Sequence, residues 1–298
     1  MSLNYFDQEG TVIGSGFKRY TARFNLDQQV NDWLKVGMST GLSRSNQRIS
    51  LTNGTEGVVQ LAVYNSPAAP VTTSAGEYAT TISVGGYNFG NALNPVARAK
   101  LREVWKLHNK ATSNIYAELI FNKHFKLRNE FNFDYNNIEN SAFQPNVITS
   151  NGTVISAPSQ LIEQRSNSLY LSLVNYLSYN QSFGKHNVSA QIGHEAQQSN
   201  SNDLSASRRN LALNFQSIGA GAQDGQTVGG GKYDWGMESY FARAGYTFDS
   251  RYALNLSLRR DGSSTFGPGK RVGYFPAASA GWTVSNEGFA SGWNFINN

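Results

Sequence analysis

Hydrophobic and polar residues alternate with a period of two along much of this chain. In the clearest segment, 126–137, apolar side chains at 127, 131, 133 and 135 share one face, and charged or amide side chains fill the even positions. An extended strand with one apolar side has this period. The other segments that alternate are 2–9, 18–27, 33–44, 113–121, 168–179, 187–195, 238–248, 251–260 and 273–284. The pattern predicts roughly ten strands, many of about 10 to 14 residues, which is long for a soluble sheet.

The connections between these strands alternate between short and long. The short links fall at 28–32, 122–125, 182–187 and 249–250, and aromatic residues flank each one. The long connections, rich in Gly, Asn, Ser and Gln, cover 48–104, 140–166, 200–237 and 262–272. Unstructured loops longer than about 12 to 15 residues are uncommon in compact soluble domains. Outer-membrane barrels combine tight periplasmic turns, long extracellular loops and aromatic girdles, so the sequence predicts an antiparallel transmembrane β-barrel.

The composition changes this picture little. Charged residues make up 15% of the 298 residues and aromatic residues 12%, an aromatic content that excludes a disordered chain. No window approaches the roughly 20 apolar residues of a transmembrane helix. The mean hydropathy of −0.43 suits a barrel, because only an outward band about 25 Å tall must be apolar. A soluble sandwich or solenoid also alternates, but strand length and loop asymmetry favour the barrel.

Candidate chemistry is sparse. The net charge of +5 is scattered, and its densest cluster, at 100–110, accompanies no nucleic-acid-binding motif. The four histidines stand alone and there is no cysteine, which excludes cysteine nucleophiles and the common zinc motifs. Asp224 and Asp261 lie in runs without the acidic density of a calcium loop, so no motif supports calcium in the loops or in a partner. The sequence predicts no enzyme, no metal site and no cofactor.

One pair of segments is specific enough to suggest a family. Residues 259–264 read Arg-Arg-Asp-Gly-Ser-Ser, and Phe-Pro and Gly-Trp follow at 275–276 and 281–282. This arrangement resembles the barrel of SusC/RagA-type TonB-linked outer-membrane transporters, and 4–10, 19–21, 31–37 and 94–97 agree with it. The signature residues are Arg259, Arg260, Asp261, Gly262, Phe275, Pro276, Gly281 and Trp282.

The resemblance implies how the chain relates to a complete member. Such a protein has a signal peptide, a TonB box and a plug domain before a barrel of about 22 strands. Residues 1–298 are therefore expected to be the middle portion of a barrel, with roughly ten of those strands and long extracellular loops. The signal peptide, the TonB box, the plug and the C-terminal strands are expected to lie outside this segment.

The resemblance also implies a function and partners. A SusC-like protein of the bacterial outer membrane takes up oligosaccharides or glycan fragments, is energised by TonB–ExbB–ExbD through its N-terminal region, and is covered by a SusD-like surface lipoprotein. The lipoprotein would dock on the long loops. Uptake of peptides, siderophores or cobalamin is the closest alternative. A passive porin or an adhesin built on the same barrel is a second one.

Aromatic residues in the long connections are the candidates for ligand binding, because sugar rings stack on aromatic faces. A short helix is predicted over 95–107, begun by a proline in its first turn and ending near the entrance of a strand. Packing of the loops, or of the lipoprotein on them, is the competing explanation for these residues. The candidates are Tyr87, Phe89, Trp105, Tyr233, Asp234 and Trp235.

The charged triplet at 259–261 has a predicted orientation. Successive strand residues point to opposite faces, so Arg259 and Asp261 are expected to face the lumen and Arg260 to face outward toward lipid phosphates. A pair between Arg259 and Asp261 or another lumen acid would fix the strand geometry, which makes a structural role the favoured one. Trp33 and Trp282 are expected to anchor the barrel at the membrane interface.

Overall fold

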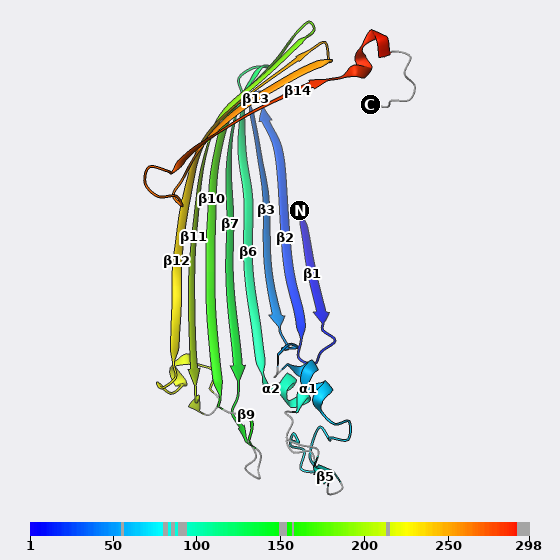
Figure 1. Ribbon diagram of the computed structural model, residues 1–298, viewed down its shortest axis with the longest axis vertical. Coiled ribbons are helices and arrows are strands. Elements are labelled where there is room, and N and C mark those ends of the chain that lie inside the picture. Colours follow the sequence, from blue (N-terminus) through cyan, green and yellow to red (C-terminus); the bar gives the residue numbers. More distant parts are fainter. Residues whose placement is uncertain are drawn as a thin grey trace.

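The computed structural model describes residues 1–54, 57–79, 94–148, 158–212 and 215–290, and the backbone alone of 83–84, 87–88 and 154–156. Ten strands form one antiparallel sheet in which each strand pairs with its neighbours in chain order (Figure 1). They are β1 (Ser2–Glu9), β2 (Gly16–Asn31), β3 (Leu34–Arg48), β6 (Glu103–Ile120), β7 (Phe125–Gln144), β10 (Gln160–Phe183), β11 (His186–Arg209), β12 (Thr227–Phe248), β13 (Tyr252–Ser263) and β14 (Val272–Trp282).

The smaller elements lie in the connections. They are α1 (Val58–Tyr64), α2 (Pro95–Leu101), the two-residue strands β4 (Ser83–Val84), β5 (Tyr87–Asn88) and β8 (Val147–Ile148), the strand β9 (Val154–Ser156), and short 3-10 turns at Ile218–Ala220, Val284–Asn286 and Gly288–Ala290. No helix in the described ranges is long and apolar enough to cross a membrane. The predicted all-β, antiparallel fold is confirmed.

Strands are longer than the alternation predicted. β10 and β11 have 24 residues each, so either one reaches about 80 Å at the usual rise of a strand. The predicted connections 140–166 and 200–237 shrink to 145–159 and 210–226, because the strands extend into them. Serine, asparagine and glycine looked like loop residues in the sequence, yet their backbones pair in the same ladder as the apolar parts of the strands.

The two ends of the sheet differ in their connections. Tight turns join β2 to β3, β6 to β7, β10 to β11 and β12 to β13 at one end, and α1, α2, β5 and β9 lie at the other (Figure 1). At the tight end, Asp249 and Ser250 both have positive φ, at 50° and 54°. Two such residues form the hairpin turn whose twist matches that of the strands it joins. The predicted alternation of short and long connections is therefore present.

The helix α2 begins where the sequence indicated and ends earlier. The Asn94 side chain accepts hydrogen bonds from the backbone N–H groups of Val96 and Ala97 at 3.0 and 3.1 Å, and Pro95 occupies the first turn. The helix ends at Leu101 rather than at 107, because β6 begins at Glu103 and draws the chain into the sheet.

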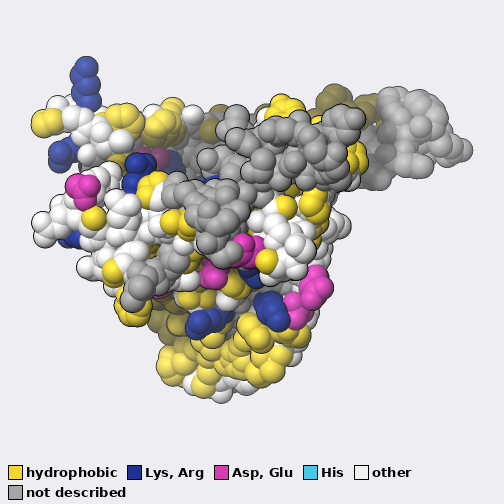
Figure 2. Space-filling view, turned by 90° about the horizontal axis from the view of Figure 1, so that it is seen from below, with side chains coloured by type: hydrophobic (Ala, Val, Ile, Leu, Met, Phe, Trp, Pro, Cys, Tyr) yellow, Lys and Arg dark blue, Asp and Glu magenta, His cyan; other side chains and the backbone are white. Residues whose placement is uncertain are grey.

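Many large apolar side chains of the sheet are exposed on one face. Leu254, Leu256 and Leu258 share one face of β13, which we call the outer face, and each is 44–49% exposed. A small core exists at the long-connection end, where Phe143, Leu161 and Leu211 cluster. Figure 2 looks onto that end and shows apolar side chains gathered along one margin of the molecule. An apolar outer face of this extent is what a lipid environment requires of a barrel wall.

Candidate functional site

The opposite, inner face of the sheet carries polar and charged side chains. On β7, Glu130, Asn132 and Asp134 alternate with the outward Phe131 and Phe133. Strand pairing places the inner residues of neighbouring strands in rows across the sheet. The inner face of an outer-membrane barrel is polar, so these rows are where a dissolved molecule would contact such a wall.

Arg259 of β13 is held by two carboxylates on this face. Its Nε donates to Asp261 at 2.6 Å, and its Nη2 donates to Glu195 of β11 at 2.8 Å. The guanidinium also lies 5.9 Å from the centre of the Phe241 ring. That ring covers Gly193, where any added Cβ would overlap the ring carbons. The expected pair between Arg259 and Asp261 is thus present, and Glu195 completes it across two strands.

A second arginine repeats this arrangement on the same inner face, nearer to β2 and β3. The Arg128 guanidinium lies 3.8 Å from the centre of the Tyr116 ring and donates to Glu130 at 2.5 Å. The Tyr116 ring covers Gly37, and its hydroxyl donates to Asp27. In both places an aromatic ring shields the bare backbone of a strand glycine, and a charged arginine rests beside the ring. Both clusters stiffen the inner wall.

The aromatic residues expected at the end of the third long connection lie within β12. Trp235 and Tyr233 project to the inner face, and the Trp235 ring is 6.5 Å from that of Tyr170 on β10. Asp234 projects to the outer face, where it accepts a hydrogen bond from Asn200 at 2.7 Å. The expectation that all three share a loop is wrong, because the strand extends to Thr227 and its alternation separates Asp234 from its neighbours.

The strand pairing places Tyr170 and Trp235 in one row with two polar residues. Asp134, Tyr170, Ser199 and Trp235 occupy directly opposed positions on β7, β10, β11 and β12. The next row contains Tyr233. Sequence reasoning missed Tyr170: it lies in an alternating segment, but nothing in that segment shows which row of the sheet it joins. We call these two neighbouring rows the aromatic rows; their residues used below are Asp134, Tyr170, Ser199, Tyr233 and Trp235.

The other candidates lie elsewhere. Trp105 is the third residue of β6 and shares a face with Ile115, the outer face, where the Arg48 guanidinium lies 5.6 Å from the ring centre. Tyr87 lies on the short strand β5, of which the backbone alone is described, and Phe89 falls outside the described residues. The structure therefore brings two of the six candidates together, Tyr233 and Trp235.

The remaining signature residues lie along β13 and β14. Arg260 points outward, as expected, with its guanidinium 5.7 Å from the centre of the Tyr240 ring. Pro276 stands opposite Leu258 on β14. The other signature residues pair between β13 and β14: Gly262 with Val272, Phe275 with Arg259, Gly281 with Ala253 and Trp282 with Tyr252.

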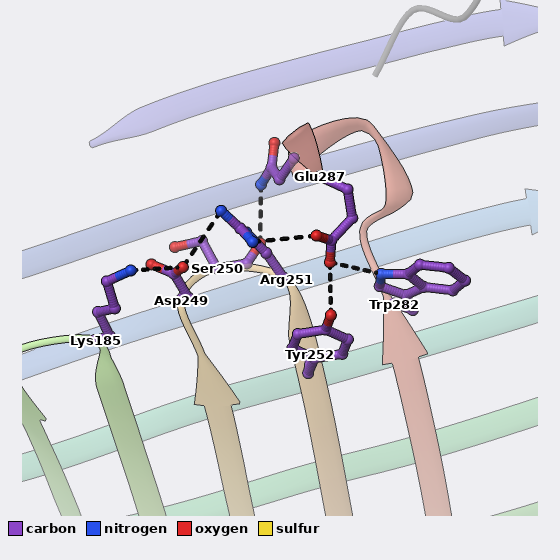
Figure 3. A network of polar contacts seen from close by, with 8 residues as sticks. Lys185, Asp249, Ser250, Arg251, Tyr252, Trp282 and Glu287 are labelled. Carbon is purple, nitrogen blue, oxygen red and sulfur yellow. Dashed lines mark hydrogen bonds and ion pairs between the residues drawn. The ribbon is translucent and has the colours of Figure 1, made fainter. Parts of the chain in front are cut away.

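A polar cluster closes the tight-turn end of β13 and β14 (Figure 3). Glu287 accepts hydrogen bonds from the Tyr252 hydroxyl at 2.6 Å, from Trp282 Nε1 at 3.1 Å and from Arg251 Nη1 at 3.1 Å. The hydrogen bond from Tyr252, followed by that from Trp282, holds the pKa of the Glu287 carboxyl below its ordinary value. These bonds tie the segment after β14 to the start of β13.

Asp249, in the turn before β13, extends this cluster. It accepts from Lys185 Nζ at 2.9 Å and lies 3.5 Å from Arg251 Nη2. The bond from Lys185 lowers the pKa of the Asp249 carboxyl. No three His, Asp or Glu side chains within the described ranges converge in a way that could hold a metal ion.

Comparison with known proteins agrees with this architecture, although no family model matches the chain. TonB-dependent receptor P3 of Formosa agariphila is 29% identical over 99% of this chain and 30% of its own length. TonB-dependent receptor SusC of Bacteroides thetaiotaomicron is 25% identical over 99% of this chain and 30% of its own length. The chain thus spans about a third of the length of the curated relatives it matches.

The solved structures show the same fold. The RagAB peptide transporter matches 96% of this chain and 32% of its own chain, with a TM-score of 0.75 and 23% identity. The RagAB peptide importer in its open-open state matches equally well, with a TM-score of 0.76. The predicted resemblance is confirmed: the chain is similar over nearly its whole length to TonB-dependent receptors of the SusC type, and its ten-stranded sheet has the fold of their barrel wall.

Proposed function

We propose that this chain forms part of the wall of a TonB-dependent importer of the bacterial outer membrane. The apolar outer face and polar inner face support a membrane barrel with a wet lumen. The similarity to TonB-dependent receptors supports energised uptake rather than passive diffusion. The TonB complex would act through a region outside this segment, and a SusD-like lipoprotein would dock on the long connections.

We propose oligosaccharides as the cargo, on the strength of the aromatic rows. Tyr170 and Trp235 offer ring faces at 44° to each other, and Tyr233 is 56% exposed one row further. Asp134, opposite Tyr170, supplies a carboxylate that can accept hydrogen bonds from sugar hydroxyls. Rings beside hydrogen-bonding side chains suit a ligand with apolar faces and hydroxyl edges.

Peptides are the second candidate cargo. The RagAB structures, which match this fold, are described as a peptide transporter and importer. The aromatic rows also suit peptide side chains, because Tyr and Trp contact many kinds of ligand.

The test uses the full-length protein with Trp235→Ala, and Trp105→Ala as the control on the outer face. We expect Trp235→Ala to weaken the binding of an oligosaccharide mixture, measured by calorimetry, by about tenfold, because one stacking face is lost. Trp105→Ala should leave it unchanged. Equal binding by parent and Trp235→Ala would refute the site. Peptide binding that depends on Trp235, without oligosaccharide binding, would show that the cargo is a peptide instead.

A further inference from the structure

An apolar hollow of about 620 Å³ opens on the outer face of the sheet, over strands β7 to β14. Its apolar lining includes Leu127, Leu177, Ile192, Ala242 and Leu258, with aromatic residues and Arg260 around them. Ile192 and Leu258 are 59% and 48% exposed, so their side chains stand out as walls on either side of the short Ala242. A hollow of this shape in a lipid-facing surface can take an acyl chain.

Arg260 lies at one end of the hollow. Its guanidinium stays beside the Tyr240 ring, and no carboxylate of the described residues forms an ion pair with it. The nearest outward acid, Glu238, instead accepts from the Tyr240 hydroxyl at 3.0 Å and contacts His194 Nε2 at 3.2 Å. Arg259, one residue away on the inner face, has two carboxylates. Arg260 is therefore an outward cation at the hollow that has no ion pair within the described residues, although the charge of Glu238 also acts on it.

The position of Arg260 fits the edge of the apolar band. Along the outer face of β13, Tyr252 lies at the tight-turn end, and Leu254, Leu256, Leu258 and Arg260 follow it in that order. The eight steps from Tyr252 to Arg260 cover about 27 Å along the strand. On a strand tilted by about 40° that length rises roughly 20 Å, slightly less than the usual apolar band of about 25 Å. Arg260 thus stands near the long-connection edge of the band, from which its long side chain can reach the lipid headgroups.

We propose that Arg260 and the hollow form a binding site for a phosphate-bearing lipid of the outer leaflet. The phosphate oxygens would accept hydrogen bonds from the guanidinium, whose planar fork matches them in geometry and charge. One acyl chain would lie in the hollow over Ala242. An unpaired cation beside lipid is costly, and a phosphate partner removes that cost. The proposal rests on the outer-membrane position of the proposed function and is independent of its cargo.

The test measures lipid retention by native mass spectrometry on the full-length protein, stripped of lipid in detergent. The probes are a short-chain phosphatidic acid, the diacylglycerol with the same chains, and inorganic phosphate. The parent should retain phosphatidic acid about tenfold better than diacylglycerol, because the phosphate contact is then present. Inorganic phosphate should fail to displace it, because phosphate alone leaves the hollow empty.

Three variants separate the parts of the site. Arg260→Gln removes the charge, and Ala242→Phe fills the hollow from a lipid-facing position; each should weaken retention of phosphatidic acid by about tenfold. Arg44→Gln, on the outer face of β3, removes a cation that does not line the hollow and should have no effect.

Retention unchanged in both Arg260→Gln and Ala242→Phe would overturn the proposal, as would equal retention of the two lipids by the parent. If Arg260→Gln fails to fold, Ala242→Phe alone decides. A variant that loses transport but still retains phosphatidic acid would bear on the proposed function and not on the lipid site.

Discussion

At the scale of the residue, two glycines owe their identity to rings on neighbouring strands. Gly193 lies beneath the Phe241 ring and Gly37 beneath the Tyr116 ring, and neither position has room for a Cβ. Neither glycine needs a positive φ. Glycine is therefore required because the neighbouring ring packs directly on the backbone and occupies the space that a Cβ would take.

Replacing Gly193 by valine tests this explanation. We expect a loss of about 1–3 kcal/mol in unfolding free energy, since the Phe241 ring must move and the side chains around Arg259 move with it. The measurement is the urea midpoint of the full-length protein folded in detergent. Gly231→Val is the matched control on β12, because nothing lies within 4 Å of its Cβ position, and it should be close to neutral. Similar losses in both variants would show that the ring is not the reason.

At the scale of the element, one polar cluster joins three segments at the tight-turn end. Lys185 comes from the turn between β10 and β11, Asp249 from the turn between β12 and β13, and Glu287 from the segment after β14 (Figure 3). Backbone hydrogen bonds from Asp249 N to Lys185 O and from Thr283 N to Arg251 O, both 2.7 Å, already join neighbouring segments there. The side-chain bonds of Asp249 and Glu287 reinforce those connections.

Acid should loosen this cluster. The pKa values of Glu287 and Asp249 are lowered in the folded protein, so the stability they contribute is present above their ordinary pKa values of 4.5 and 3.8. It is lost as the pH falls through the lowered values. We expect amide hydrogen exchange in 249–251 and 283–290, corrected for intrinsic rates, to rise on acidification below about pH 4.5 while the strands stay protected.

Glu287→Gln provides the comparison for this pH effect. Glutamine has nearly the shape of glutamate but does not titrate, so 283–290 should exchange faster at neutral pH and respond less to acid. Exchange in these segments that is independent of pH in the parent would contradict the assigned role of the two carboxylates.

At the scale of the whole molecule, the sheet has two free edges. β1 and β14 each pair with one neighbour in the described structure, and the outer-face residues Leu256 and Ile192 are 49% and 59% exposed. An exposed strand edge is a template for pairing with other chains, and lipid offers no water to satisfy it. We expect the 298-residue chain alone to aggregate without detergent, as measured by size-exclusion chromatography. A monodisperse monomer that unfolds cooperatively in plain buffer would contradict the membrane assignment.

The alternation of polar and apolar residues by itself predicts much of the sheet, without knowledge of which strands pair. It indicated the strands, the side on which Arg259, Arg260 and Asp261 lie, and the tight and long connections. These features are local, because the face of a strand residue depends only on its parity. The ends of β10, β11 and β12 were missed, because polar strand residues outside the apolar band have the composition of loops.

The tertiary structure alone decided which residues meet. Glu195 and Arg259 are 64 positions apart in sequence, and Tyr170 and Trp235 lie on strands that do not pair with each other. Their contacts depend on the register of every strand between them, and a shift of two residues in one register keeps each side chain on its face while changing its neighbours. Alternation fixes the face of a residue, whereas backbone hydrogen bonds and packing between strands fix its row.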